Sequence, residues 1–178
     1  IWVPISLEEI LRVSGGAGLK QSEGFLSAKR LGLEGGATSD DILLIGIETI
    51  NSEVYVHYYP IEVKMGWNVN STIEKGIEQA KHTKGIFNEL VLPKEGHKIT
   101  STQKVYRNFL MQLAITSAEK LNLYEVCKEE NWNSVIDSDL RRKLLNEEYI
   151  VSNSIEGSLG IAAVISFKKE NSFQLVDI

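Results

Sequence analysis

Two neighbouring stretches decide the fold of this chain: "ILLIGIETI", Ile42–Ile50, and "VYVHYYPIEVK", Val54–Lys64. Both are rich in β-branched and aromatic residues, which favour extended strands. The polar tripeptide Asn51-Ser52-Glu53 separates them, as is typical of a tight turn. The pattern therefore predicts a β-hairpin in which Asn51 and Ser52 are the two turn residues.

The second strand of this hairpin carries two opposite charges near its end. Strand side chains alternate between faces, so Glu62 and Lys64 share one face while Ile61 and Val63 share the other. One face is apolar and the other is charged. This arrangement fits either a surface ion pair or half of a metal-dependent active site.

The hairpin register brings a second carboxylate to the charged face. With Asn51 and Ser52 as the turn, Asp41 lies opposite Glu62, whereas Asp40 is opposite Val63. Opposed carboxylates repel each other unless a cation lies between them, and a divalent metal is the obvious candidate. Pro60 cannot donate to the ladder and can mark a bulge. A shift of one residue at that bulge would put Asp40 in place of Asp41.

Helical periodicity and capping signals predict the elements around the hairpin. Ser6 and Glu9 form a capping-box pattern, and Ser71 and Glu74 form another after the hairpin. Apolar spacing predicts helices over 7–14, 71–92, 105–127 and 132–150, and strands over 159–167 and 172–178. This order predicts an α/β fold with a mixed sheet flanked by helices.

The composition of the 178-residue chain is that of a soluble globular protein, with 43% hydrophobic and 24% charged residues. We expect a single domain over 1–178 with its own core. No apolar run approaches the roughly 20 residues that span a bilayer, so we expect no membrane partner. A net charge of −5 argues against a chain coated in basic residues but allows a local basic patch.

The single cysteine, Cys127, excludes an internal disulfide and a zinc site built from thiolates. It suits a reducing cytoplasm, and we expect its side chain in the core of a helix. His57 is expected to pack within its strand, while His97 is expected in a loop, so a histidine-based zinc hydrolase has little support. The chain begins with Ile1 instead of Met, which favours a domain of a longer protein.

The hairpin also carries a family resemblance. "SDDILLIGI", followed after the turn by "YYPIEVKMG", resembles the PD-(D/E)xK nuclease superfamily, in which an acidic residue opens one strand and Glu-x-Lys lies on the next. "IEVK" matches the form common in Holliday-junction resolvases and Mrr-type restriction enzymes. The resemblance implies a restriction-endonuclease-like mixed β-sheet flanked by helices, and a Mg²⁺-dependent DNA endonuclease of restriction, defence or repair. Mn²⁺ would substitute for Mg²⁺ as the catalytic ion.

A longer stretch suggests a narrower relative. "LKQSEGFLSAKRLGLEGGATSDDILLIGIE" with "YPIEVK" is similar to the nuclease portion of phosphorothioation-dependent restriction proteins that have a motor ATPase. This similarity implies fusion to, or association with, a larger restriction or ATPase assembly. Whether the nuclease acts as a homodimer stays open.

The resemblance assigns roles to individual residues. Asp41 and Glu62 would be metal ligands, with the backbone carbonyl of Val63 as a third. Lys64 would orient the attacking water or offset charge on the phosphate. Many family members also have a glutamate on the first helix, and "LEEIL" offers Glu8 for that role, whereas Glu9 is the capping-box partner of Ser6.

Contacts with DNA are expected from two regions. Lys20, Lys29 and Arg30 lie between the first helix and the hairpin, near where DNA would enter such a site. Gln79 and Lys81 lie on the helix after the hairpin. RecB-type relatives carry a Gln followed four residues later by Tyr, whereas Gln79 is followed there by Thr, which departs from that subgroup. A solvated charged face explains the lysine equally well.

Two other functions stay open from the sequence. One is a catalytically inactive domain of the same fold that binds DNA or a protein partner. The other is an α/β interaction domain in which "IEVK" has arisen by chance.

Overall fold

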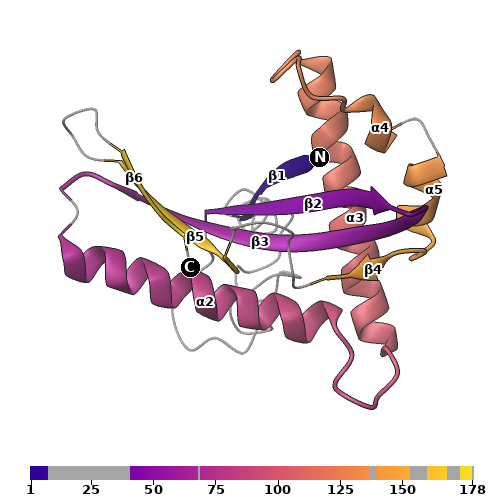
Figure 1. The fold of residues 1–178 in the computed structure, drawn as a ribbon, viewed down its shortest axis with the longest axis horizontal. Coiled ribbons are helices and arrows are strands. Elements are labelled where there is room, and N and C mark those ends of the chain that lie inside the picture. The colour runs from indigo at the N-terminus through magenta and orange to yellow at the C-terminus, as the bar shows by residue number, and fades with distance from the viewer. Residues whose placement is uncertain (8–40, 68, 137–138, 153–159, 168–172, 178) are drawn as a thin grey trace, which may run out of the picture. The chain divides into compact units, whose positions relative to one another are not determined.

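The computed structural model describes residues 1–7, 41–67, 69–136, 139–152, 160–167 and 173–177 (Figure 1). Its strands are β1 (Trp2–Ser6), β2 (Ile42–Ile50), β3 (Glu53–Met65), β4 (Ile150–Val151), β5 (Ala163–Phe167) and β6 (Phe173–Asp177). Its helices are α2 (Asn70–Val91), α3 (Ser101–Leu123), α4 (Asn133–Ile136) and α5 (Asp139–Leu145). None of these described helices is long and apolar enough to cross a membrane.

The described strands form one mixed sheet. Its order is β1-β2-β3-β5-β6, with β4 also paired to β3. Strand β3 is parallel to both β4 and β5, whereas β5 and β6 are antiparallel. A mixed sheet with helices confirms the predicted α/β class.

The predicted hairpin is confirmed, and its turn has the expected geometry. Asn51 and Ser52 separate β2 from β3 and have φ values of 51° and 72°. Two successive residues with positive φ are typical of the turns whose twist matches that of the strands they join. The turn is thus consistent with a hairpin in which Asn51 and Ser52 are the two turn residues.

The chain divides into two compact units, and β2 and β3 run through both. Unit 1 contains 1–5, 44–58 and 87–156, and unit 2 contains 6–43, 59–86 and 157–178. All the described residues of the predicted metal site belong to unit 2.

Unit 1 is built around α3. This helix begins with a capping box in which the Thr100 side chain accepts from the Gln103 N–H and the Gln103 side chain accepts from the Thr100 N–H. Ser117 Oγ on the helix donates to the Pro4 carbonyl oxygen of β1 at 2.6 Å. The rings of Tyr58 and Phe87 stack with centroids 6.2 Å apart. The hydrogen bond therefore joins α3 to β1, and the stacked rings join β3 to the end of α2, which contains Phe87.

Several predicted boundaries in unit 1 are wrong. The helix predicted over 105–127 starts earlier, at Ser101, because Thr100 is a capping residue that the prediction overlooked. It ends at Leu123, because Glu125 and Cys127 adopt positive φ. Cys127 is exposed in this turn, not buried in a helix.

The pattern predicted as one helix over 132–150 is divided into α4 and α5 and ends at β4. Strand β1 was not predicted. The helix predicted over 7–14 lies outside the described residues except for Leu7.

Unit 2 places α2 along the second half of β3 and its partner β5 (Figure 1). In the parallel pairing, Glu62 is the Cα partner of Val164 and Lys64 is the partner of Ser166. The two predicted C-terminal strands are confirmed, although β5 starts only at Ala163. Helix α2 starts at Asn70, so Ser71 lies inside the helix. The prediction that Ser71 is the N-cap is therefore wrong.

Candidate metal site beside strand β3

Glu62 lies in the interior of unit 2. The residue is 6% exposed, and its Oε1 accepts a hydrogen bond from Lys64 Nζ. Its other oxygen, Oε2, is buried and has no hydrogen-bond partner among the described residues. A buried acceptor without a partner costs about 1–3 kcal/mol, and more when it is charged. The surface ion pair that the sequence left open is therefore excluded, because the carboxylate is buried.

Lys64 is held from two sides. Its Nζ donates to Glu62 Oε1 on the same strand and to Gln79 Oε1 on α2, the latter at 2.9 Å. The lysine side chain is 21% exposed, compared with 7% for that of Glu62. Strand alternation places Glu62 and Lys64 on one face, and the contact with Gln79 shows that α2 covers that face. The ammonium group thus lies between a carboxylate and an amide oxygen.

Asp41 lies next to these residues, immediately before β2. Its Oδ2 accepts a hydrogen bond from the Val63 backbone N–H at 2.8 Å. This bond places the Asp41 carboxylate against β3 at Val63, the residue between Glu62 and Lys64 in the sequence. The pairing of Asp41 with Glu62 itself stays a prediction. Asp41 is half-buried. Its alternative, Asp40, lies outside the described residues.

The described donors suit a hard cation better than zinc. Among the described residues, no three His, Cys, Asp or Glu side chains form a group that could hold a metal ion. The site offers carboxylate oxygens from Asp41 and Glu62, and Mg²⁺ is often bound by one or two carboxylates while it keeps several waters. The unpartnered Oε2 of Glu62 is an oxygen of the required kind. The residues present therefore fit Mg²⁺ or Mn²⁺. The Val63 carbonyl as a ligand stays a prediction.

Helix α2 contributes more to the site than the sequence indicated. Gln79 was predicted to contact DNA, and in the structure its side chain accepts a hydrogen bond from Lys64. Gly76, one turn earlier, is buried beside Lys64 and Val164. A glycine within a helical pattern is a signal in the sequence, but it marks the exposed Gly85 of this helix as much as Gly76. No comparable signal marks Ser166, which is fully buried on β5 as the Cα partner of Lys64.

A second buried lysine lies further along α2. Lys84 is 5% exposed, and burial lowers its pKa from 10.5 to about 8. Burial disfavours the charged form of a lysine because the ammonium group loses its water. Lys84 is therefore not part of an exposed basic face on α2.

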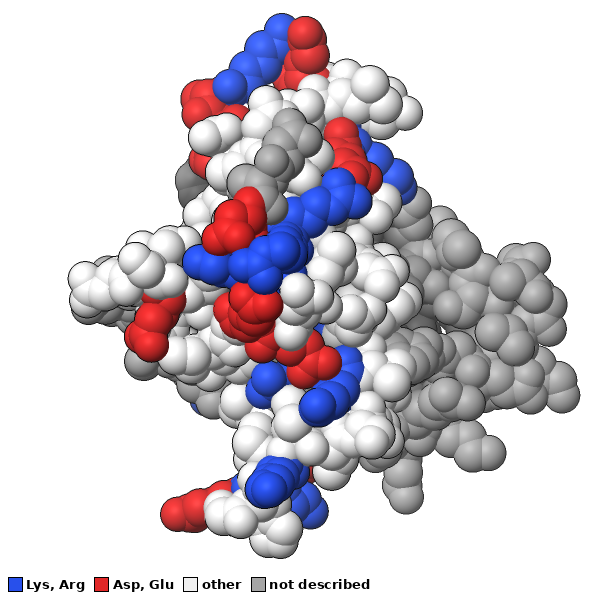
Figure 2. Space-filling view, turned by 90° about the vertical axis from the view of Figure 1, so that its right-hand side faces the viewer, with Lys and Arg blue, Asp and Glu red and all other residues white. Residues whose placement is uncertain are grey.

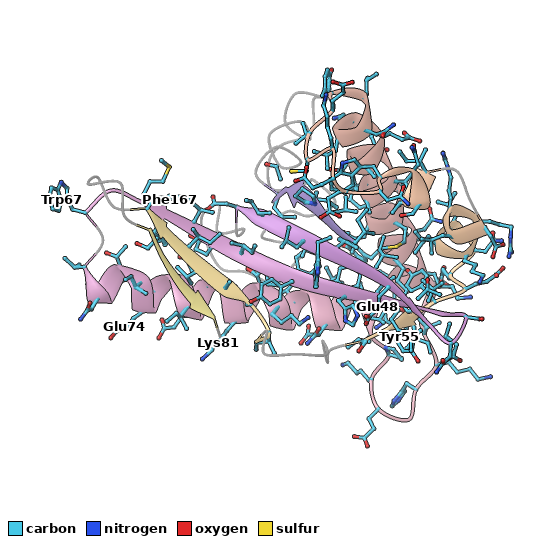
Figure 3. The ribbon with its side chains drawn as sticks, turned by 45° about the horizontal axis from the view of Figure 1, so that its top comes forward. Glu48, Tyr55, Trp67, Glu74, Lys81 and Phe167 are labelled. Atoms are coloured by element: carbon cyan, nitrogen blue, oxygen red, sulfur yellow. The ribbon has the colours of Figure 1, made fainter. Side chains whose placement is uncertain are left out.

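The remaining predicted residues are divided between the surface and the undescribed part of the chain. Lys81 is exposed on α2, which also carries the exposed Glu74 (Figure 3). Glu8, Lys20, Lys29 and Arg30 lie outside the described residues, as does Glu9. Their predicted contacts with the metal or with DNA stay predictions.

Unit 1 carries a mixed surface around α5. Lys and Arg alternate there with Asp and Glu (Figure 2). Arg142 pairs with Asp139 at 2.8 Å and with Glu148 at 2.9 Å, and Arg141 pairs with Glu119 at 3.0 Å. These arginines are neutralised by neighbouring carboxylates, so the surface around α5 does not form a basic patch for a phosphate backbone.

His57 in unit 1 is packed, as expected. It is 3% exposed, and its Nε2 lies 2.6 Å from Glu48 Oε1 across the hairpin. Its ring also lies 6.2 Å from that of Trp2. This pair joins neighbouring strands and has no described contact with the predicted metal site.

No protein-family model, curated protein or solved structure matches the chain.

Proposed function

We propose that this chain is a metal-dependent DNA endonuclease of the PD-(D/E)xK type, with a restriction-endonuclease-like fold. The observation that carries the proposal is the buried Glu62 carboxylate, which has one oxygen on Lys64 and the other without a described partner. A buried ion pair serving only stability would be expected to satisfy both oxygens. A buried carboxylate oxygen left unsatisfied is what a metal ligand requires, and Asp41 contacts the next residue of the same strand, Val63.

The carboxylates would hold Mg²⁺ or Mn²⁺. When bound, the ion would polarise a phosphate oxygen and lower the pKa of a bound water. Glu62 would use Oε2, which leaves its bond to Lys64 intact. The Val63 N–H fixes one oxygen of Asp41 and thereby orients the other. Each carboxylate is therefore held by a hydrogen bond that leaves one of its oxygens for the metal.

Lys64 would act on the phosphate or on the attacking water. A fixed ammonium group stabilises charge that develops on the phosphate, and it can orient a water through hydrogen bonds. Its bonds to Glu62 and Gln79 hold Nζ in place before substrate binds. Such preorganisation lowers the cost of reaching the transition state. Gln79 therefore supports catalysis by holding Lys64.

The biological setting follows only from the sequence resemblance. We propose that the nuclease acts in restriction, defence or DNA repair, in the cytoplasm and as part of a larger restriction or ATPase assembly. Its partner would be DNA.

Cleavage of supercoiled plasmid DNA with Mg²⁺, with Mn²⁺ and with EDTA tests this function. Glu62→Gln should abolish metal-dependent cleavage, and Lys64→Ala should lower the rate on the order of 10²–10⁴-fold. Glu125→Gln and Lys128→Ala are matched controls, because these residues form an exposed Glu–Lys pair in unit 1. Both controls should cleave like the wild type.

Two results would overturn the proposal. If the wild type leaves DNA intact with either metal, the nuclease assignment is wrong, and tight DNA binding in the same samples would favour the inactive binding domain. If cleavage survives in both Glu62→Gln and Lys64→Ala, the activity belongs to another site or to a contaminant.

A further inference from the structure

We infer that Gly76 is a positioning residue for Lys64: its missing side chain leaves the space on α2 in which the lysine lies. The inference rests on the proposed function, because it concerns the group assigned to the phosphate. It adds a determinant that is outside the Asp, Glu and Lys pattern.

The space at Gly76 is limited on two sides. A β-carbon at this position would lie 3.3 Å from Lys64 Cε and 3.2 Å from Val164 Cγ1. Carbon atoms in favourable contact are about 3.5–4.0 Å apart. An alanine would therefore overlap both neighbours by a few tenths of an ångström. Only a glycine lets α2 approach β3 and β5 this closely without moving one of them.

The lysine should move before the valine does. Val164 is fully buried on β5, where close packing resists displacement, whereas the Lys64 side chain is flexible and 21% exposed. Lys64 Cε is bonded directly to Nζ, so moving it disturbs the bonds to Glu62 and to Gln79. The clash thus acts on the atom that the proposed chemistry uses.

Gln79 reinforces this interpretation. It follows Gly76 by three residues, a spacing that places the two positions on one side of a helix. Helix α2 therefore supplies both the space for the lysine stem and an acceptor for its ammonium group. Glycine within a helix costs about 1 kcal/mol relative to alanine, and the close approach of Lys64 and Val164 at Gly76 offsets this cost.

The same helix provides a matched control. Gly85 also lies within α2 and is exposed, and a β-carbon there would meet nothing within 4 Å. Gly76→Ala and Gly85→Ala make the same chemical change in the same helix. They differ in the contact with Lys64 and Val164.

The kinetic test compares these two variants at saturating DNA and Mg²⁺. Gly76→Ala should lower kcat about tenfold with little change in KM, because small displacements of a catalytic group affect the rate more than binding. Gly85→Ala should keep the wild-type kcat. Equal kcat values in the two variants would overturn the inference.

A second readout does not depend on cleavage. The Lys64 ammonium resonance in ¹⁵N-labelled protein, assigned by its loss in Lys64→Arg, reports the bonds to Glu62 and Gln79. It should shift or broaden in Gly76→Ala and stay unchanged in Gly85→Ala. A changed resonance in a protein that never cleaves DNA would support the positioning role while refuting the nuclease. An unchanged resonance and rate in an active nuclease would refute only the role of Gly76.

A second variant keeps the inference testable if Gly76→Ala folds poorly. Val164→Ala removes the closest neighbour of the new β-carbon, so Gly76→Ala/Val164→Ala can be compared with Val164→Ala alone. If relief of the valine contact lets α2 shift, the double variant should recover part of the rate and of the resonance. If the single variant folds and the double variant recovers both the rate and the resonance completely, Lys64 is disturbed through Val164 packing and not by direct contact with the new β-carbon, which would overturn the inference.

Discussion

Metal binding at Glu62 should stabilise the protein against heat, and this effect can be measured without any assay of DNA cleavage. A ligand that binds only the folded state at 100 times its Kd adds about 2.7 kcal/mol to the free energy of unfolding. For a chain of this length, 1 kcal/mol raises Tm by about 2–4 °C. Saturating Mg²⁺ or Mn²⁺ should thus raise Tm by about 5–10 °C.

The change Glu62→Gln should remove this rise in Tm. Glutamine keeps the size of the side chain and an oxygen for Lys64, but it loses the negative charge that the metal needs. Scanning calorimetry with increasing metal concentration measures the effect. Both proposed ligands, Asp41 and Glu62, belong to unit 2. If the two units unfold in separate transitions, only the transition of unit 2 should move to higher temperature.

The control is Glu125→Gln, which removes an exposed carboxylate of unit 1 and should leave the metal-induced rise unchanged. The same rise in Glu62→Gln as in the wild type would refute the assignment of Glu62 as a ligand. A wild type with no rise at millimolar concentrations of both ions would refute the metal site itself.

Three further outcomes are expected. Burial lowers the pKa of Lys84 to about 8, below its unfolded value, so the free energy of unfolding should rise between pH 8 and about 10.5. Lys84→Met should abolish this rise. In urea titrations at pH 7 it should stabilise the protein by up to about 3 kcal/mol. Gln79→Leu should lower the cleavage rate about tenfold, since Lys64 loses one acceptor, and wild-type kinetics would contradict this role. Gly46→Ala should destabilise unit 1 by about 1–3 kcal/mol in the same titrations, because a β-carbon there would lie 2.6 Å from the Trp2 ring. Unchanged stability would contradict that contact.

Local patterns in the sequence predicted the central hairpin and the positions of its charged residues. Asn51 and Ser52 suit a turn with positive φ, and both residues adopt it. Strand alternation put Glu62 and Lys64 on one face, and the turn brought Asp41 to the same strand. Alternation and turn geometry extend over a few residues, so they can be recognised without knowing the rest of the fold.

Boundaries were predicted less well where a short signal competed with periodicity. Thr100 caps α3 ahead of the apolar pattern, and the positive φ values at Glu125 and Cys127 end the helix within a stretch that still looks helical. Strand β1 and the division between α4 and α5 depend on pairing and packing partners far away in the chain, which local propensity does not contain.

The sequence by itself determined which residues could form a metal site, because side-chain alternation and a two-residue turn are local properties. Only the tertiary structure decided that this face is covered. Glu62 is buried with its Oε2 lacking a described partner, and helix α2 sets Gly76 and Gln79 against Lys64. Packing between distant segments decides which helix covers a strand and how closely it approaches. In this protein that packing makes a charged pair on a strand part of a buried candidate site.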